Sequence, residues 1–437
     1  MATDAGTEIP RFPAGFLWGV STSAHQIEGA AEEREASVWD VFTAEPGRVK
    51  DGSTAAVACD HYHRYAEDVA LLAGLGVDAY RFSVSWPRVN SPGGLDFYDR
   101  LVDELCAAGV RPVPTLFHWD LPASLDWLER DTAARFADYV TAVAARLGDR
   151  VGTWITLNEP AEHTLLGHAI GAHAPGGRLL FDALPVAHHQ LLAHGLAVRA
   201  LRAAGATDIG IANSHGPTWP ASGEPADVEA AGFYDLLLNR LFAEPVILGA
   251  YPDGMGELMP GDVPEDLLVI AEPVDWYGVN YYAPSLVGAP GSGGGEYGGL
   301  ALPAGLPFSV REIRDRPVTD FGWPVVPEGL TELLTGFRDR YGDRLPPVVI
   351  TENGCSYEGV DDQDRITYLD AHIRALHRAV EAGVDVRGYF VWSLMDNFEW
   401  AEGYARRFGL VHVDRTTLAR TPKSSYHWFR ELLRAQR

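Results

Sequence analysis

The chain has 437 residues, of which 46% are apolar and 22% are charged, and its formal net charge is −25. This composition is typical of a globular protein with a large core, and the length fits one large α/β barrel as well as two or three average domains. The negative charge disfavours nucleic acids and anionic membrane surfaces as partners, because both would repel it.

The three cysteines, Cys59, Cys106 and Cys355, are odd in number and unrelated in spacing. A disulfide framework or a CxxC metal or redox site is therefore not expected. The first ten residues lack a basic cluster followed by an apolar stretch, and nowhere do about 18 apolar residues run together. These features predict a cytoplasmic protein.

Strand-like segments alternate with amphipathic, helix-like segments along the whole chain. The strand candidates, in chain order, are 16–20, 79–84, 111–116, 152–157, 208–212, 276–282, 348–352 and 387–392. The helix candidates between them are 62–73, 97–108, 133–147, 187–204, 228–242, 330–341 and 366–382, and Gly109, Gly205 and Gly383 are expected as C-terminal caps. This alternation predicts right-handed β–α–β crossovers and a single (β/α)8 TIM barrel domain spanning residues 1–437. The Gly-rich segment 287–305 is expected to be a long loop over the top of this barrel.

Two glutamates each follow an apolar, β-type run. They occur in Thr156-Leu157-Asn158-Glu159-Pro160 and in Ile350-Thr351-Glu352-Asn353-Gly354. Both carboxylates are thus predicted at the C-terminal ends of parallel strands, where catalytic groups collect in α/β barrels. A pair of carboxylates in this position indicates a hydrolytic site of the kind that cleaves glycosidic bonds.

Several longer motifs occur in a fixed order. They are Phe16-Leu17-Trp18-Gly19, Gln26-Ile27-Glu28-Gly29, Tyr80 to Arg88, Phe117-His118-Trp119-Asp120-Leu121-Pro122, the two Glu motifs, Asn280-Tyr281-Tyr282 and Gly388 to Trp400. With these motifs the chain resembles glycoside hydrolase family 1, the retaining β-glycosidases, from Phe12 to about Arg430. The resemblance also implies a (β/α)8 barrel.

By this resemblance Glu159 is the acid/base and Glu352 the nucleophile, which must stay ionised while Glu159 holds its proton. Arg81, expected at the end of the second strand, and the Tyr282 hydroxyl are the candidates for stabilising the charge of Glu352. Asn280 is also predicted to be one of the catalytic residues. The alternatives are an ordinary ion pair for Arg81 and a core aromatic for Tyr282.

The resemblance further assigns sugar-binding roles to residues at or beyond strand ends. These are Gln26, His118, Trp119, Asn158, Trp323, Trp392, Glu399, Trp400 and Phe408. Asn158 would bond the 2-hydroxyl, Trp392 would stack on the sugar, Phe408 would lie near the 6-position, and Trp323 would line the leaving-group side. Taken singly, Trp392 is equally consistent with core packing and His118 with a buried, hydrogen-bonded histidine.

The predicted activity is hydrolysis of terminal, non-reducing β-D-glucosyl residues, with a small-molecule carbohydrate as the partner and no cofactor. A carboxylate at Glu399 would repel a 6-phosphate, which argues for unphosphorylated sugars. The alternatives are β-galactosidase or β-fucosidase specificity, a transglycosylating enzyme and a non-catalytic sugar-binding relative. A metal-dependent barrel amidohydrolase is also considered, because His61-Tyr62-His63 has HxH spacing. Cys355 is either a small buried residue or a thiol near the pocket.

Overall fold

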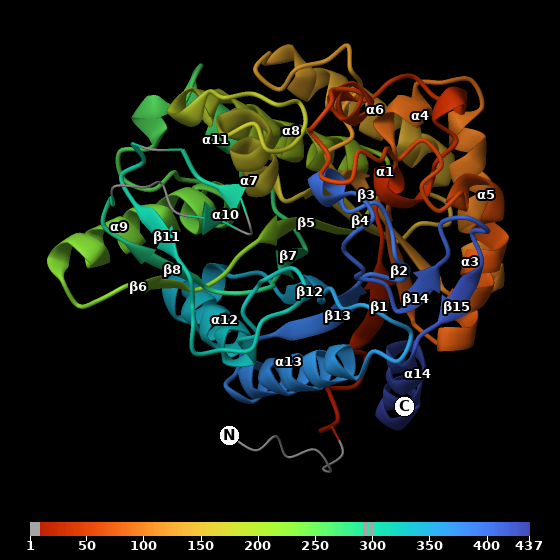
Figure 1. The fold of residues 1–437 in the computed structure, drawn as a ribbon. Helices are drawn as coiled ribbons and strands as arrows, with labels where there is room; N and C mark the ends of the chain where they lie inside the picture. The colour runs from red at the N-terminus through yellow and green to blue at the C-terminus, as the bar shows by residue number, and fades with distance from the viewer. Residues whose placement is uncertain (1–8, 292–295, 298–299, 304) are drawn as a thin grey trace.

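Eight parallel strands close into a barrel at the centre of the molecule (Figure 1). The structure is a computed structural model that describes residues 9–291, 296–297, 300–303 and 305–437. The barrel strands are β1 (Leu17–Ser21), β2 (Ala79–Ser83), β3 (Arg111–Phe117), β4 (Thr153–Asn158), β5 (Asp208–Ser214), β7 (Trp276–Asn280), β12 (Val348–Asn353) and β13 (Val386–Trp392). They follow one another around the barrel in chain order, and β13 closes it against β1. The predicted strands and the predicted TIM barrel are confirmed.

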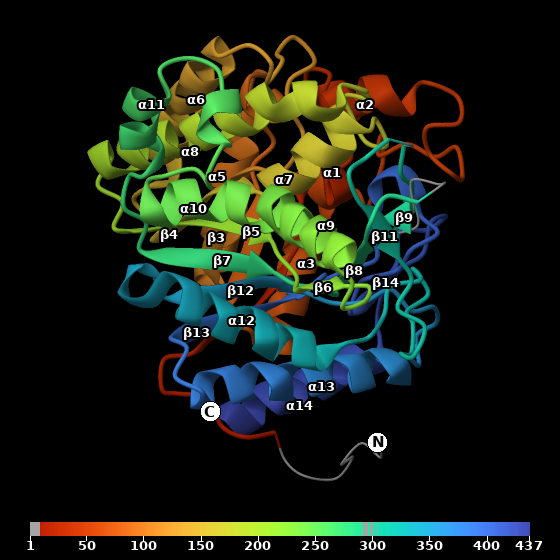
Figure 2. The same ribbon diagram turned by 90° about the vertical axis from the view of Figure 1, so that its left-hand side faces the viewer.

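Helices surround the barrel on its outer side (Figure 1). The predicted helices are present as α3 (His61–Leu75), α5 (Gly94–Ala107), α6 (Asp131–Leu147), α8 (Leu184–Ala203), α12 (Pro327–Tyr341) and α13 (Gln363–Glu381). Figure 2 shows α12 and α13 side by side along the barrel. The glycines expected as caps, Gly109, Gly205 and Gly383, have φ values of 73°, 91° and 93°, the left-handed conformation that ends a helix.

Segment 228–242 was predicted to be one helix. This prediction is wrong, because the segment is divided among three helical elements. It comprises α9 (Pro225–Asp235), the π-helix η4 (Leu236–Arg240) and α10 (Leu241–Leu248). Two further helices, α11 (Val263–Ile270) and α14 (Ser424–Gln436), were not predicted from the sequence.

The remaining elements are short and join the barrel units. The helical turns are α1 (Ala24–Ile27), η1 (Ala31–Glu33), α2 (Val38–Thr43), α4 (Trp86–Val89), α7 (Pro160–Glu162), the π-helix η2 (His163–Ala169), η3 (Leu180–Ala183), η5 (Gly256–Leu258), η6 (Gly342–Arg344) and η7 (Trp400–Glu402). The short strands are β6 (Thr218–Pro220), β8 (Ser285–Gly288), β9 (Glu296–Tyr297), β10 (Leu300–Ala301), β11 (Ser309–Arg311), β14 (Val411–Val413) and β15 (Arg420–Pro422). Segment 287–305, predicted as a loop, therefore includes the end of β8 and the β9–β10 pair, while residues 292–295, 298–299 and 304 lie outside the described residues.

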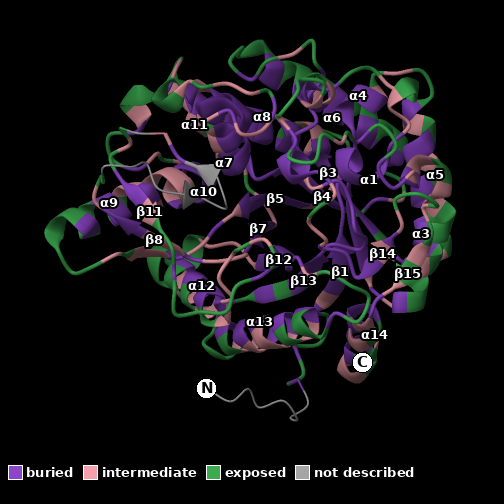
Figure 3. Ribbon diagram, in the orientation of Figure 1, coloured by how far each residue is buried: buried purple, intermediate pink, exposed green. Residues whose placement is uncertain are grey.

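The barrel strands are buried on both faces, whereas the surrounding helices expose their outer faces (Figure 3). Large aromatic rings fill part of the barrel where glycines leave room for them. A Cβ on Gly19 would lie 2.3 Å from the Phe390 ring, and one on Gly210 would lie 2.6 Å from the Trp276 ring. Such close packing holds the strand ends, and hence the residues that follow them, in fixed positions. Within the described ranges, every helix is too short or too polar to cross a bilayer.

A buried ion pair joins the C-terminal strands to the first outer helix. Asp68 on α3 is fully buried and accepts hydrogen bonds from Arg420 Nε at 2.8 Å and Arg420 Nη2 at 3.0 Å. His61, the first histidine of the HxH spacing, lies 2.8 Å from the same carboxylate through its Nδ1 atom. This histidine is therefore part of a structural contact between α3 and β15.

Replacing Arg420 with Met should lower the free energy of unfolding by about 3–5 kcal/mol, because Asp68 would keep a buried charge without its main partner. Urea denaturation measures this loss. The control is Arg135→Met, whose ion pair with Asp131 is mostly exposed and should contribute less than about 1 kcal/mol. Equal losses in the two variants would contradict the prediction.

Candidate active site

A cavity of about 640 Å³ opens at the C-terminal ends of the barrel strands. Most of the residues predicted for the site line it, namely His118, Trp119, Glu159, Tyr282, Trp323, Glu352, Trp392, Glu399, Trp400 and Phe408. The other predicted residues, Gln26, Arg81, Asn158 and Asn280, lie behind these and bond to them. The structure thus brings all the predicted residues together around one pocket.

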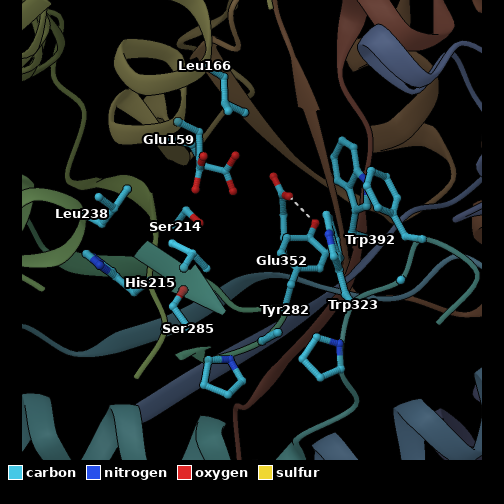
Figure 4. Close-up of a pocket in the computed structure, with 18 of the residues that line it drawn as sticks. Glu159, Leu166, Ser214, His215, Leu238, Tyr282, Ser285, Trp323, Glu352 and Trp392 are labelled. Carbon is cyan, nitrogen blue, oxygen red and sulfur yellow. Dashed lines mark hydrogen bonds between the residues drawn. The ribbon is translucent and has the colours of Figure 1, made fainter. Parts of the chain in front are cut away.

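Glu352 lies one residue before the end of β12, and each of its carboxylate oxygens has a donor. Arg81 Nη1 donates to Oε1 at 2.6 Å, and the Tyr282 hydroxyl donates to Oε2 at 2.7 Å (Figure 4). Arg81 was predicted at the end of the second strand, but it lies in the middle of β2. Its long side chain crosses the barrel interior to reach Glu352 on β12.

The Arg81 guanidinium has further partners on other strands. Its Nε donates to Thr115 Oγ1 at 3.1 Å, its Nη1 to the Thr351 carbonyl at 3.0 Å, and its Nη2 to Asn158 Oδ1 at 2.5 Å. The side chain is fully buried, so a set of oxygen partners is needed to compensate for lost hydration. Arg81 therefore connects β2, β3, β4 and β12 at the base of the pocket.

Glu159 directly follows β4 and has a φ of 47°, which is uncommon for a residue with a side chain. Its backbone N–H donates to the Ala212 carbonyl on β5 at 2.8 Å. Its Oε1 atom accepts a hydrogen bond from Asn280 Nδ2 at 2.8 Å. Figure 4 shows Glu159 on the wall of the pocket opposite Trp323, with Glu352 between them.

The two glutamates have different electrostatic surroundings. Burial and the negative charge of Glu352 raise the pKa of Glu159 well above its usual value. Burial also raises the pKa of Glu352, but the Arg81 charge and the Tyr282 hydrogen bond oppose this rise. When the pair carries one proton, that proton therefore resides on Glu159 and Glu352 is ionised.

A third carboxyl group lies deeper in the same pocket. Gln26 Nε2 donates to Glu399 Oε2 at 3.2 Å and to Asn397 Oδ1 at 3.1 Å, and its own Oε1 accepts from Ser23 Oγ at 2.6 Å. Burial and the charge of Glu352 raise the pKa of Glu399 to about 8. Polar groups that can bond several hydroxyls therefore gather on this side.

Aromatic rings form the wall beside these polar groups. The His118 ring is nearly parallel to that of Trp392, with a centroid distance of 5.7 Å and an angle of 18°. It is also nearly parallel to Trp400, at 6.0 Å and 19°. Asn158 Nδ2 donates to His118 Nε2 at 3.1 Å, so the Nδ1 atom of this histidine carries the proton, and that atom has no partner among the described residues. Burial lowers the pKa of His118 well below its usual value, which keeps it neutral.

Comparison with known proteins identifies the family to which the chain belongs. The model of glycosyl hydrolase family 1 matches residues 9–437. The chain belongs to glycosyl hydrolase family 1. Thermostable β-glucosidase B of Thermobispora bispora is 46% identical over 99% of this chain and 92% of its own length.

Two solved structures show the same likeness in three dimensions. The psychrophilic β-glucosidase BglU of Micrococcus antarcticus matches with a TM-score of 0.92 and 43% identity, over 99% of this chain and all of that one. The β-glucosidase of Thermotoga maritima in complex with glucoimidazole matches with a TM-score of 0.90 and 41% identity, over 98% and 99% of the two chains. The protein is therefore a family 1 glycosidase.

The outer part of the pocket of this family 1 chain includes side chains that the sequence analysis did not single out. Phe321 stacks on Trp323 with ring centroids 4.2 Å apart, and both line the cavity. Glu402 also lines it and forms ion pairs with Lys50 and with Arg406, the latter at 3.2 Å. Phe321 could have been found from the sequence by its position two residues before Trp323. Glu402 could have been found by its position three residues after Glu399.

Two alternatives from the sequence lose their support in the structure. Cys355 is fully buried outside the set of lining residues, and burial raises the pKa of its thiol to about 12, so it behaves as a small core residue. His61, the first histidine of the HxH spacing, bonds to Asp68 through its Nδ1 atom. Over the described ranges, no three His, Cys, Asp or Glu side chains gather as metal ligands would.

Replacing Glu399 with Gln should change how stability depends on pH. The carboxyl has a pKa of about 8 in the folded protein, above its usual 4.5, so between these values the folded state binds one more proton than the unfolded chain. The contribution of Glu399 is therefore present at pH 4.5 and is lost as the pH rises to 8. The unfolding free energy of the wild type minus that of Glu399→Gln should fall by roughly 4 kcal/mol over this window.

Urea denaturation at several pH values between 5 and 8 tests this expectation. Glu229→Gln, at an exposed position on α9, is the matched control and should give a difference that does not vary with pH. A constant difference for Glu399→Gln as well would show that this carboxyl ionises normally.

Proposed function

We propose that this protein is a retaining β-glucosidase that removes terminal, non-reducing β-D-glucosyl residues from glucosides and short oligosaccharides. The observation that carries the proposal is the pair Glu159 and Glu352, which face one pocket in different electrostatic surroundings. The two relatives of solved structure and the Thermobispora relative are β-glucosidases by name, which supports the same activity here.

In the proposed reaction the ionised Glu352 attacks the anomeric carbon while Glu159 gives its proton to the leaving oxygen. The C–O bond to the aglycone breaks and an ester bond to Glu352 forms. Glu159, now ionised, then removes a proton from water, and the resulting attack at the anomeric carbon releases Glu352 and the sugar. Two inversions at the same carbon retain the β-configuration.

Arg81 and Tyr282 serve Glu352 in this scheme. Their hydrogen bonds occupy both carboxylate oxygens and favour the ionised form, which is the form that attacks. Asn280 serves Glu159 by holding its Oε1 atom, and it also bonds to Asn158 Oδ1 at 3.0 Å. The catalytic group is thus held by side chains of β2, β4, β7 and the residues that follow them.

The sugar is proposed to bind on the side of Gln26, His118 and Glu399, whose polar atoms bond its hydroxyls. The free Nδ1–H of His118 points to one such bond. Asn158 is assigned to the 2-hydroxyl, Trp392 with Trp119 and Trp400 to the apolar face, and Phe408 to the 6-position. This side would repel a phosphorylated sugar when Glu399 is ionised. Trp323 is assigned to the leaving-group side.

We further propose that residues 1–437 act as one catalytic domain in the cytoplasm. A single barrel carries every residue assigned to the site. All three cysteines lie within the described ranges and are unpaired, which suits a reducing compartment.

Replacing Glu352 with Gly should reduce kcat for an aryl β-glucoside on the order of 10⁴-fold or more, since the attacking group is lost. Azide should restore turnover by occupying the vacated space, and the product should be the α-glucosyl azide. In Glu159→Ala the ester still forms, so azide should give the β-glucosyl azide instead. Product NMR distinguishes the two anomers. Glu358→Gly, at an exposed position nearby, is the control and should keep its activity; full activity in Glu352→Gly would refute the assignment.

A panel of p-nitrophenyl glycosides tests the sugar preference. We expect kcat/KM to be highest for the β-D-glucoside and lower for the β-D-galactoside and β-D-fucoside. Above pH 8, where Glu399 is ionised, kcat/KM for the 6-phosphoglucoside should be at least about 100-fold lower than for the β-D-glucoside, because two negative charges would then meet at Glu399. A galactoside or fucoside that ranks first would replace the glucosidase proposal by the corresponding alternative.

A further inference from the structure

Arg365, in the first turn of α13, is a buried cation outside the set of residues that line the catalytic pocket. Its Nε atom donates a hydrogen bond to Asp362 Oδ2 at 2.7 Å, and the side chains of both residues are at most 1% exposed. Asp362 also accepts hydrogen bonds from Ser425 N at 2.8 Å and from Ser425 Oγ at 2.6 Å. The ion pair is therefore anchored between the N-terminal ends of α13 and α14.

The other four N–H groups of Arg365 donate to backbone carbonyls. Nη1 donates to the carbonyl of Cys355 and, at 3.0 Å, to that of Phe408. Nη2 donates to the carbonyl of Tyr357 at 3.0 Å and to that of Arg407 at 2.8 Å. All five donors of the guanidinium thus have an acceptor. Two of the carbonyls belong to the segment after β12 and two to the segment after β13, so Arg365 ties these segments to each other.

The same segments are also bonded directly, and a third segment joins them. Tyr357 N donates to the Arg407 carbonyl at 3.3 Å, and Arg407 N donates to Ser356 Oγ at 2.9 Å. Asp320 N donates to the Ser356 carbonyl at 3.1 Å. Three segments from different parts of the chain are therefore held as one unit.

This unit supplies three aromatic side chains to the wall of the catalytic pocket, namely Phe321, Trp323 and Phe408. The centroid of the Phe408 ring lies 6.0 Å from those of Phe321 and Trp323, and 6.4 Å from that of Tyr282. Phe408 is only 1% exposed, so its ring is packed on nearly all sides. Because Arg365 holds the backbone carbonyl of Phe408, it fixes the point from which this ring enters the wall.

We propose that Arg365 is a positioning residue that fixes Phe408 and thereby sets the preference of the pocket for sugars with a hydroxymethyl group at C5. The inference rests on the proposed β-glucosidase function and its assignment of Phe408 to the 6-position. A guanidinium suits this task because its donors are fixed in one plane and point in several directions. The ammonium of a lysine has the same charge, but its three donors lie on one atom and cannot reach four carbonyls and a carboxylate.

The test compares p-nitrophenyl β-D-glucoside with p-nitrophenyl β-D-xyloside, which lacks only the hydroxymethyl group at C5. Arg365→Lys keeps a charge beside Asp362 but loses carbonyl bonds, so the Phe408 ring should no longer fit that group closely. The ratio of kcat/KM for the glucoside to kcat/KM for the xyloside should fall roughly tenfold, mainly through KM for the glucoside, while kcat/KM for the xyloside changes less than about twofold. Arg378→Lys, at an exposed position on α13, is the matched control and should leave the ratio unchanged.

A double-mutant cycle tests the path of the effect. Phe408→Ala should itself lower the ratio, and adding Arg365→Lys to it should lower the ratio no further, because Arg365 acts through Phe408. Ser356→Ala removes the hydrogen bond to Arg407 N without changing a charge, and it should lower the ratio about threefold. This variant decides the question if Arg365→Lys does not fold.

A purely structural role would lower the activity on both sugars by the same factor. An unchanged ratio in Arg365→Lys, or in Ser356→Ala where the lysine variant does not fold, would therefore overturn the inference. So would additive effects of Arg365→Lys and Phe408→Ala, or a wild type that cleaves both sugars with equal kcat/KM. Failure of the β-glucosidase proposal itself is distinguished by the wild type, which would then not cleave p-nitrophenyl β-D-glucoside.

Discussion

The contact between Arg81 and Glu352 is the interaction on which the rest of the site depends. Both side chains are buried, and a charge in that position is stable only with a close partner of opposite sign and further hydrogen bonds. The guanidinium has five N–H donors, and four of its bonds go to β3, β4 and β12. One side chain therefore sets both the ionisation of Glu352 and the position of Asn158, which explains why a long, permanently charged residue is placed inside the barrel.

The barrel gives Glu159 and Glu352 different surroundings although both lie at the C-terminal ends of parallel strands. Glu352 is reached from β2 by a cation, whereas the amide of Asn280 on β7 is the donor that holds Glu159. An amide donates a hydrogen bond but carries no charge, so it orients the carboxyl without forcing it to ionise. This difference separates the proposed nucleophile from the proposed acid, and it arises from side chains of non-adjacent strands that meet inside the barrel.

The pocket is divided into two parts that come from different elements of the fold. Its inner part comes from segments that directly follow β1, β3 and β13, and it combines polar atoms with flat aromatic rings, as a neutral sugar requires. Its outer part comes from added elements, the π-helices and strands β8 and β11, and it mixes apolar side chains such as Leu166 and Leu238 with polar ones such as Asn239 and Arg311. Strand ends cannot vary much without disturbing the barrel, whereas added elements can. Recognition of the sugar is thereby separated from recognition of what is attached to it.

The sequence alone determined the barrel and the identity of the paired carboxylates, because strands buried on both faces appear as continuous apolar runs and each glutamate ends such a run. Resemblance to family motifs also indicated Gln26, Glu399 and the aromatic residues. Only the tertiary structure decided that Arg81 acts from mid-strand and that segment 228–242 contains a π-helical turn. These features depend on distances between segments far apart in the chain. Local periodicity carries no information about such distances, which are set when the strands close and the helices pack.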